Sequence, residues 1–180
     1  MLNAISILDE KDKRLREISQ PVVFPLTSQD KELIKKMAAY LKSSQIKEIA
    51  KKYQLRPGMG LAASQLGINK RYFVIVHEEE EQKFKEYIMI NPTIVSYSEE
   101  QIYAIDGEGC LSVNREVAGV VPRYARVTIT GFNMEGKKIT IRAREELAIA
   151  FQHEIDHLDG ILFIDKVINP LEASSSMRGI

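Results

Sequence analysis

Two of the three histidines in the sequence, His153 and His157, lie four residues apart with Glu154 between them. On a helix, side chains at this spacing project from one face with Cβ atoms roughly 5 to 6 Å apart, so both imidazoles can bind one metal ion. Glu154 follows His153 by about 100° around the helix and would stand beside that ion as a base. This H-E-x-x-H pattern is typical of metal-assisted hydrolysis, although an amphipathic helix can also carry two histidines by accident.

The pattern lacks one ligand, because catalytic zinc-type sites use three protein ligands and keep one position for water. A metzincin protease would place a third histidine where this chain has Phe163. A thermolysin-like site needs a downstream glutamate on another helix, but the only glutamate after His157 is Glu172, in a short serine-rich tail. The missing ligand is therefore expected upstream, and the single cysteine, Cys110, is the candidate.

Cys110 lies in the segment Glu108-Gly109-Cys110-Leu111-Ser112, between expected strands. The glycines around it would let the backbone approach a metal or a substrate closely. A lone cysteine is more often a small buried hydrophobe, and only the incomplete H-E-x-x-H favours the ligand interpretation. A thiolate and two neutral imidazoles leave a divalent ion with a net charge near plus one, which still lowers the pKa of bound water.

A glycine-containing segment, residues 58–65, reads Gly-Met-Gly-Leu-Ala-Ala-Ser-Gln. Its start matches the G-x-G-x-x-A of a dinucleotide fingerprint, but that loop should follow a buried strand, whereas this one follows Pro57 and a polar helical segment. The alternative is a loop that brings the Gln65 side-chain amide toward the metal, where it would be a suitable oxyanion donor. A purely structural Gln65 that caps a short helix is the other interpretation.

The composition is that of an ordinary globular chain of 180 residues, with 44% hydrophobic and 28% charged residues. Lysine plus arginine and aspartate plus glutamate both number 25, so no strong field favours nucleic acid or an anionic membrane, and a polyanionic partner would be bound locally or weakly. The N-terminus shows no export signal, and no apolar stretch reaches the roughly 20 residues that span a bilayer. With a single cysteine, these features predict a cytoplasmic protein without membrane or specific nucleic-acid binding.

Hydrophobic periodicity indicates which elements must position these residues. Several expected strands precede the strong helix that carries the histidines, and this order indicates an α+β fold. We expect a single domain, residues 1–180, with antiparallel and mixed β-sheets packed around a central metal-binding helix. The pattern predicts helices over 29–43, 45–53 and 144–158, and strands over 71–77, 87–97, 124–132 and 138–142.

Four local features carry expectations of their own. Ser28 is a plausible N-cap of the first long helix. The acidic run 78–81 should be a solvated turn, and the serine-rich tail 173–176 should be flexible. His77, the third histidine, is expected at the surface rather than at the metal.

Three segments together resemble the three motifs of the peptide deformylases: residues 58–65, 108–112 and 152–160, the last reading Gln-His-Glu-Ile-Asp-His-Leu-Asp-Gly. They have the right order and separations, and Arg123 within Val121-Pro122-Arg123 and the early Pro21-Val22 resemble the family too, so the likeness covers nearly the whole chain. Ser64 stands where many members have proline or threonine, a difference outside the expected chemistry. Residues 22–26 and 113–121 are similar to the type 2 enzymes of Gram-positive bacteria, and Leu171 to Ile180 is too short for the C-terminal helix by which type 1 enzymes dock on the ribosome.

The resemblance implies a metal-dependent hydrolase that removes the N-formyl group from the formyl-methionine of nascent polypeptides and releases formate. Glu154 would be the general base and acid on metal-bound water, and Gln65 with the Leu111 backbone N–H would hold the oxyanion. One divalent ion is implied, with Fe²⁺ expected and Ni²⁺, Co²⁺ or Zn²⁺ able to substitute. Its ligands would be Cys110, His153 and His157.

Residues close to the metal ligands are expected to select the substrate. Ile149 and Ala150 lie one turn before His153, so they would line an apolar pocket for an unbranched methionine side chain, unless they are simply core. Met59 and Leu61 would extend this wall, and Gly60 would offer backbone hydrogen bonds to an extended peptide.

The residues alone are compatible with two alternative functions. A metal-binding or peptide-binding module without turnover would be plausible had Glu154 or Gln65 been lost, and neither is lost. A small metallopeptidase would use the same helix but would normally need a groove for residues on both sides of the bond. The expected partners are N-formylmethionyl nascent peptides, with transient proximity to the ribosome.

Overall fold

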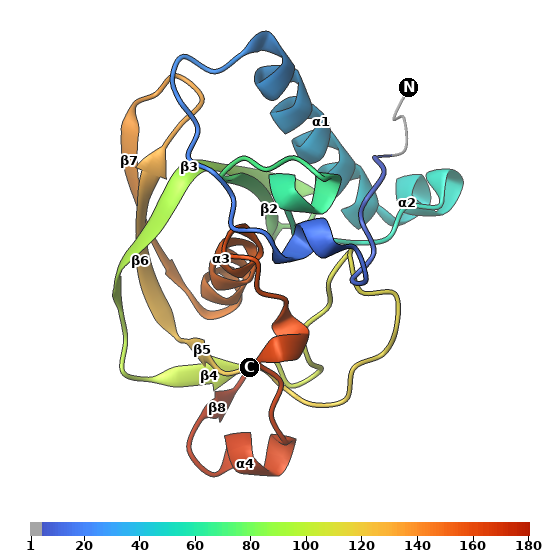
Figure 1. Ribbon diagram of the computed structural model, residues 1–180. Coiled ribbons are helices and arrows are strands. Elements are labelled where there is room, and N and C mark those ends of the chain that lie inside the picture. Colours follow the sequence, from blue (N-terminus) through green and yellow to red (C-terminus); the bar gives the residue numbers. More distant parts are fainter. Residues whose placement is uncertain (1–4) are drawn as a thin grey trace.

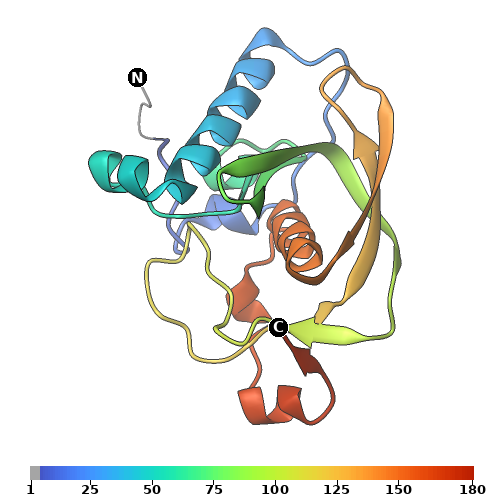
Figure 2. The same cartoon turned by 180° about the vertical axis from the view of Figure 1, so that it is seen from behind.

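The computed structural model describes residues 5–180 and has an α+β architecture in which two sheets surround one central helix, α3 (Glu145–Leu158) (Figure 1). The large sheet has the strand order β1-β2-β3-β6-β7, and the small sheet has the order β5-β4-β8. Figure 2 shows from behind how the large sheet curves around α3. The expected fold class is therefore confirmed, while residues 1–4 of the predicted domain lie outside the described range.

The helices and strands largely follow the expected order. The other helices are α1 (Ser28–Gln45), α2 (Lys47–Tyr53) and α4 (Pro170–Ser174). The strands are β1 (Gly60–Ala62), β2 (Tyr72–Glu80), β3 (Lys83–Tyr97), β4 (Gln101–Tyr103), β5 (Arg123–Tyr124), β6 (Arg126–Phe132), β7 (Lys138–Arg144) and β8 (Arg178–Gly179). Short 3₁₀ turns cover Lys13–Arg16, Ala63–Leu66 and Phe163–Asp165.

Strand β2 gives the large sheet two apolar faces, because successive side chains along a strand point to opposite sides. Tyr72 and Val74 pack with α1 in one buried cluster. Phe73 and Ile75 point the other way and pack with α3, where the rings of Phe73 and Phe151 meet edge to face with centroids 5.7 Å apart. A strand buried on both faces reads as a continuous apolar run, and this one holds the histidine-bearing helix against the sheet.

Strand β1 forms one edge of the large sheet. It pairs antiparallel with β2, with Gly60 opposite Ile75, and no other strand of the described residues lies on its far side. Backbone groups on that side can therefore bond an additional strand. In the small sheet β8 runs parallel to β4, so the sheet is mixed.

Two local expectations near the ends of elements are wrong. The N-cap of α1 is Thr27 rather than Ser28, because the Thr27 hydroxyl accepts a hydrogen bond from the Asp30 N–H at 3.1 Å. The acidic residues 78–80 are not a turn but the end of β2, which pairs with β3 in an exposed hairpin. Lysines across that hairpin compensate the acidic charges, as in the ion pair of Lys85 with Glu79 at 3.2 Å.

The C-terminal tail also differs from its expectation. Residues 170–174 form α4, in which Ala173 is fully buried, and residues 178–179 form β8. The prediction of a flexible segment at 173–176 is wrong because pairing with β4, far away in sequence, folds the tail onto the small sheet.

His77 lies within β2 and is partly exposed, with its Nε2 at 3.6 Å from Glu146, and it is not among the grouped metal donors. Within residues 5–180, no helix combines the length and the apolar character needed to cross a bilayer.

Candidate metal centre

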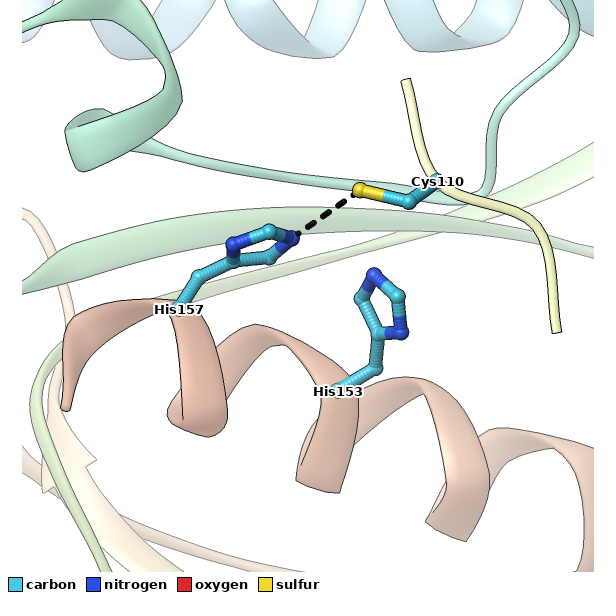
Figure 3. Close-up of side chains that lie close together, drawn as sticks. All are labelled: Cys110, His153 and His157. Carbon is cyan, nitrogen blue, oxygen red and sulfur yellow. Dashed lines mark hydrogen bonds between the residues drawn. The ribbon is translucent and has the colours of Figure 1, made fainter. Parts of the chain in front are cut away.

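Helix α3 positions both histidines. Phe151 and Ile155 hold one side of the helix in the core, so the side chains of His153 and His157 project together from another side (Figure 3). Their ring centroids lie 4.9 Å apart at an interplanar angle of 74°. Both residues are buried, which limits competition from water for the ring nitrogens.

Cys110 approaches the same point from the loop between β4 and β5. Its Sγ lies 3.3 Å from Nε2 of His157 (Figure 3). Arg56 fixes this loop, since its guanidinium donates to the carbonyl oxygens of Cys110 and Val113, each at 3.0 Å, and of Leu111 at 2.9 Å. No local sequence pattern indicates this role of Arg56, because its partners lie more than fifty residues away.

The structure brings the three expected ligands together. The donor atoms of Cys110, His153 and His157 lie within 4.8 Å of one another, and all three residues are buried. Soft sulfur with two imidazoles suits zinc, iron, cobalt or nickel in a tetrahedral arrangement with one open position. Burial lowers the pKa of His157 well below its usual value, which keeps this ring in the neutral form that binds metals.

A charged network behind His153 orients this ring. Glu108 accepts hydrogen bonds from Arg123 Nε and Nη2 at 2.7 and 2.9 Å, and its Oε2 lies 2.8 Å from Nδ1 of His153. Arg123 also donates to Asp156 at 2.6 Å, and Lys166 donates to both oxygens of Asp156 at 2.7 and 2.8 Å. A carboxylate on the second ring nitrogen is the usual way to fix the tautomer of a metal-binding histidine.

Glu108 lies in the cysteine motif, where the sequence pattern indicates no role for it, and the structure supplies one. Burial alone would raise the pKa of Glu108, but the hydrogen bonds from Arg123 and His153 outweigh it and hold the pKa at about 2. Hydrogen bonds with Cys110 and Glu108 raise the pKa of His153 against the opposing effect of burial.

The surroundings of Glu154 are opposite to those of Glu108, because no charged partner in the described part of the chain compensates its burial. It is 3% exposed, and its Oε2 has no hydrogen-bond partner among residues 5–180. From the protein groups alone, burial raises the pKa of Glu154 to about 7. The backbone of Gly60 passes so close that a Cβ added there would overlap Oε1 of Glu154, so any larger residue at this point of β1 requires Glu154 to shift.

The Gln65 side chain caps a 3₁₀ turn and also lies beside the metal donors. Its Oε1 accepts a hydrogen bond from the Ala62 N–H at 2.9 Å and so caps the 3₁₀ turn. Its Nε2 donates to the Ser112 hydroxyl at 3.1 Å and lies 3.6 Å from the Cys110 sulfur. The cap fixes which end of the amide faces the metal donors, so an N–H donor is presented beside them.

One large cavity of about 760 Å³ opens onto these groups. It is bounded by α3, by the segment around β1 and by the cysteine loop. Leu61 is not part of this lining, because its fully buried side chain packs in the core cluster with α1, on the other side of β1. The expected site residues that do line the cavity are Met59, Gly60, Gln65, Cys110, Leu111, Ile149, Ala150, His153 and Glu154.

Comparison with known proteins identifies the relatives of the chain. The family model described as polypeptide deformylase matches residues 4–173. Peptide deformylase of Shouchella clausii is 48% identical over 93% of this chain and 91% of its own, and peptide deformylase 2 of Bacillus subtilis is 44% identical over the same shares. The crystal structure of peptide deformylase from Thermotoga maritima is 31% identical, with a TM-score of 0.72 over 90% of this chain and 96% of that one.

The family match spans nearly all of the chain, and the similarity to proteins named peptide deformylase 2 agrees with the type 2 resemblance. The solved structure extends the likeness from sequence to fold. The chain therefore belongs to the polypeptide deformylase family, whose members are metallohydrolases that act on the amide bond of N-formylated nascent peptides.

Proposed function

We propose that this protein removes the formyl group of N-terminal formyl-methionine by a reaction in which Glu154 moves the proton and one metal ion, expected to be Fe²⁺, is held by Cys110, His153 and His157. The observation that carries the proposal is a buried carboxylate without a partner among the described residues, next to three buried metal donors. When bound, the metal supplies a Lewis acid that activates water and polarises the formyl carbonyl.

Glu154 is suited to accept and return one proton. Its pKa of about 7 lies close to neutral pH, where a general base and acid is most effective. The free Oε2 accepts the proton of the attacking water and then delivers it to the leaving amine nitrogen. One carboxylate serves both steps, so no second acid is required.

The oxyanion that develops on the formyl oxygen needs donors in fixed positions. The Gln65 amide is held by Ala62 and Ser112 and points toward the Cys110 sulfur. The Leu111 backbone N–H, in the loop fixed by Arg56, is the second donor in this proposal. Donors that are already oriented cost no reorganisation when the charge develops.

The substrate peptide would extend from the metal donors along the open edge of β1. Backbone groups at Gly60 can bond it as an added strand. Met59, Ile149 and Ala150 line the adjacent cavity and offer an apolar wall for the methionine side chain. We place the reaction in the cytoplasm, near the ribosome, where formylated chains are made.

The test compares two substrates with and without chelator. We expect formate release from a formyl-Met tripeptide, its loss with chelator, and its recovery when Fe²⁺ is returned under anaerobic conditions. An unblocked peptide should stay intact. Cleavage of that peptide would favour a metallopeptidase instead, and metal binding without formate release would favour a binding module.

A further inference from the structure

Arg56 directs its guanidinium at backbone oxygens rather than at a carboxylate. It donates to the carbonyl oxygens of Cys110 and Val113 from Nη2 and to that of Leu111 from Nη1. Its other acceptor in the described part of the chain is the side-chain oxygen of Asn114, so no acceptor carries a formal charge. A hydrogen bond from a charged donor is about twice as strong as a neutral one and polarises its acceptor. The positive charge of Arg56 therefore acts on three peptide groups of one loop.

These carbonyl oxygens belong to one tight turn. The Val113 N–H donates to the Cys110 carbonyl at 3.1 Å and closes the turn. The glycine-containing segment that follows Arg56 packs on it, since a Cβ added at Gly58 would lie 2.8 Å from Leu111 Cδ1. Arg56 itself is exposed, but Cys110 and Leu111 are only 8% and 7% exposed. The residues whose peptide groups it contacts are thus shielded from water, where a hydrogen bond is electrostatically stronger.

Each carbonyl shares its peptide group with the N–H of the next residue, and in a trans peptide the two point in opposite directions. The Cys110 carbonyl is therefore the far end of the Leu111 N–H, the second oxyanion donor of the proposed reaction. This N–H has no acceptor among residues 5–180 and can bond a ligand. The Leu111 carbonyl is the far end of the Ser112 N–H, which donates to the Cys110 sulfur at 3.4 Å.

A hydrogen bond to a carbonyl draws electron density from its peptide group and makes the N–H of that group a stronger donor, by roughly 10–30% per bond. The rigid fork of a guanidinium also fixes the directions of the groups that it contacts. We propose that Arg56 is a positioning residue that strengthens and orients the Leu111 and Ser112 N–H groups together. It acts through these peptide groups on the oxyanion and on the metal-binding sulfur of Cys110. This role rests on the proposed deformylation.

The first test measures formate release from a formyl-Met tripeptide by Arg56→Met, which keeps an unbranched stem and removes the guanidinium. We expect kcat to fall by about 10- to 30-fold, less than the roughly 10²- to 10³-fold loss caused by removing a complete oxyanion donor. KM should stay nearly constant, because the weakened interaction is made only in the transition state. Arg56→Lys keeps a cation without the fork, so it should lose less of kcat than Arg56→Met.

A second readout does not depend on turnover. The ¹⁵N resonance of an amide responds to hydrogen bonding at the carbonyl of the same peptide group. In the zinc-loaded protein, Arg56→Met should therefore shift the ¹⁵N resonances of Leu111 and Ser112 upfield. Arg115→Met is the matched control, because Arg115 lies in the same loop but bonds the Glu10 carboxylate, at 2.8 and 3.1 Å. It should change neither kcat nor the two resonances.

Unchanged resonances in Arg56→Met, a loss confined to KM, or an equal loss of kcat in Arg115→Met would overturn the role of Arg56. Thermal unfolding shows whether each variant is folded, and the resonances and kcat of Arg56→Lys decide the matter if Arg56→Met is not. Absence of formate release by the unaltered protein would instead overturn the proposed function. The resonances alone would then decide whether Arg56 polarises the two peptide groups.

Discussion

Two buried carboxylates flank His153, and their surroundings are opposite. Glu108 is fully paired, with Arg123 and His153 holding its pKa at about 2. Glu154 has a free Oε2, and burial raises its pKa to about 7. In the proposed reaction the same functional group therefore has two roles set by its neighbours: the paired carboxylate orients a ligand, and the unpaired one exchanges a proton.

The largest effect is expected at Glu154. Glu154→Gln keeps the shape of the side chain but removes its ability to accept a proton, so kcat for formate release should fall by about 10³-fold or more. Metal content should stay at that of the unaltered protein, because the three ligands are unchanged. Appreciable turnover by this variant, measured with excess Fe²⁺, would contradict the proton-transfer role.

The next effect concerns the position of Glu154 rather than its chemistry. Gly60→Ala places a methyl group on the carboxylate, so Glu154 must shift, and a displacement of about 1 Å can lower kcat by roughly 10²-fold. Gly109→Ala is the control, since a Cβ there meets no protein atom within 4 Å. Equal losses of kcat in the two variants would argue that added bulk in the cavity, not the position of Glu154, is responsible.

The two sides of His153 also differ in how well the sequence predicted them. The side with Glu154 follows from local periodicity, because His153, Glu154 and His157 lie within a single helix. Cys110 was found by counting ligands, and Gln65 by its glycine loop. The paired side depends on Arg123, whose bonds to Glu108 and Asp156 join chain segments that no local pattern connects.

The fold also has features that local sequence patterns predict and features that they do not. The strands and helices with strong periodicity were predicted, and the register of β6 with β7 follows from their short connection. Strand β8 was missed because two residues carry no periodic signal, and only the pairing with β4 defines them. The expectation for Leu61 fails because Gly60–Ala62 form strand β1, on which side chains alternate, and the Leu61 side chain points into the core.

A smaller effect is expected on the paired side. Glu108→Gln removes the charge that holds His153 Nδ1 and leaves Arg123 without its main partner, so metal affinity should fall by about 10- to 100-fold. Titration with a competing chelator measures this directly. Excess metal should restore much of the activity of Glu108→Gln but none of that of Glu154→Gln, and identical behaviour of the two variants would remove the distinction between an orienting and a proton-transferring carboxylate.

The smallest effect is on the stability of the metal-free protein. The folded pKa of Glu154, about 7, lies above the ordinary value of 4.5, so the folded state binds more protons between these values. The stabilising contribution of protonated Glu154 is therefore complete below pH 4.5 and is lost as the pH rises through 7. For Glu108, whose pKa is about 2, the contribution is complete above pH 4.5 and is lost only as the pH falls toward 2.

Between pH 5 and 7, urea unfolding with chelator present should therefore reveal the raised pKa of Glu154. The free energy of unfolding of Glu154→Gln relative to the unaltered protein should rise with pH, with a slope of at most about 1.4 kcal/mol per pH unit. The direct contribution of Glu108 stays flat in this range, because Glu108 is ionised in the folded protein throughout it. A pH-dependent difference for Glu108→Gln would instead report His153, whose pKa is raised by the hydrogen bond with Glu108. A Glu154→Gln difference that stays flat between pH 5 and 7 would show that burial does not raise the pKa of Glu154.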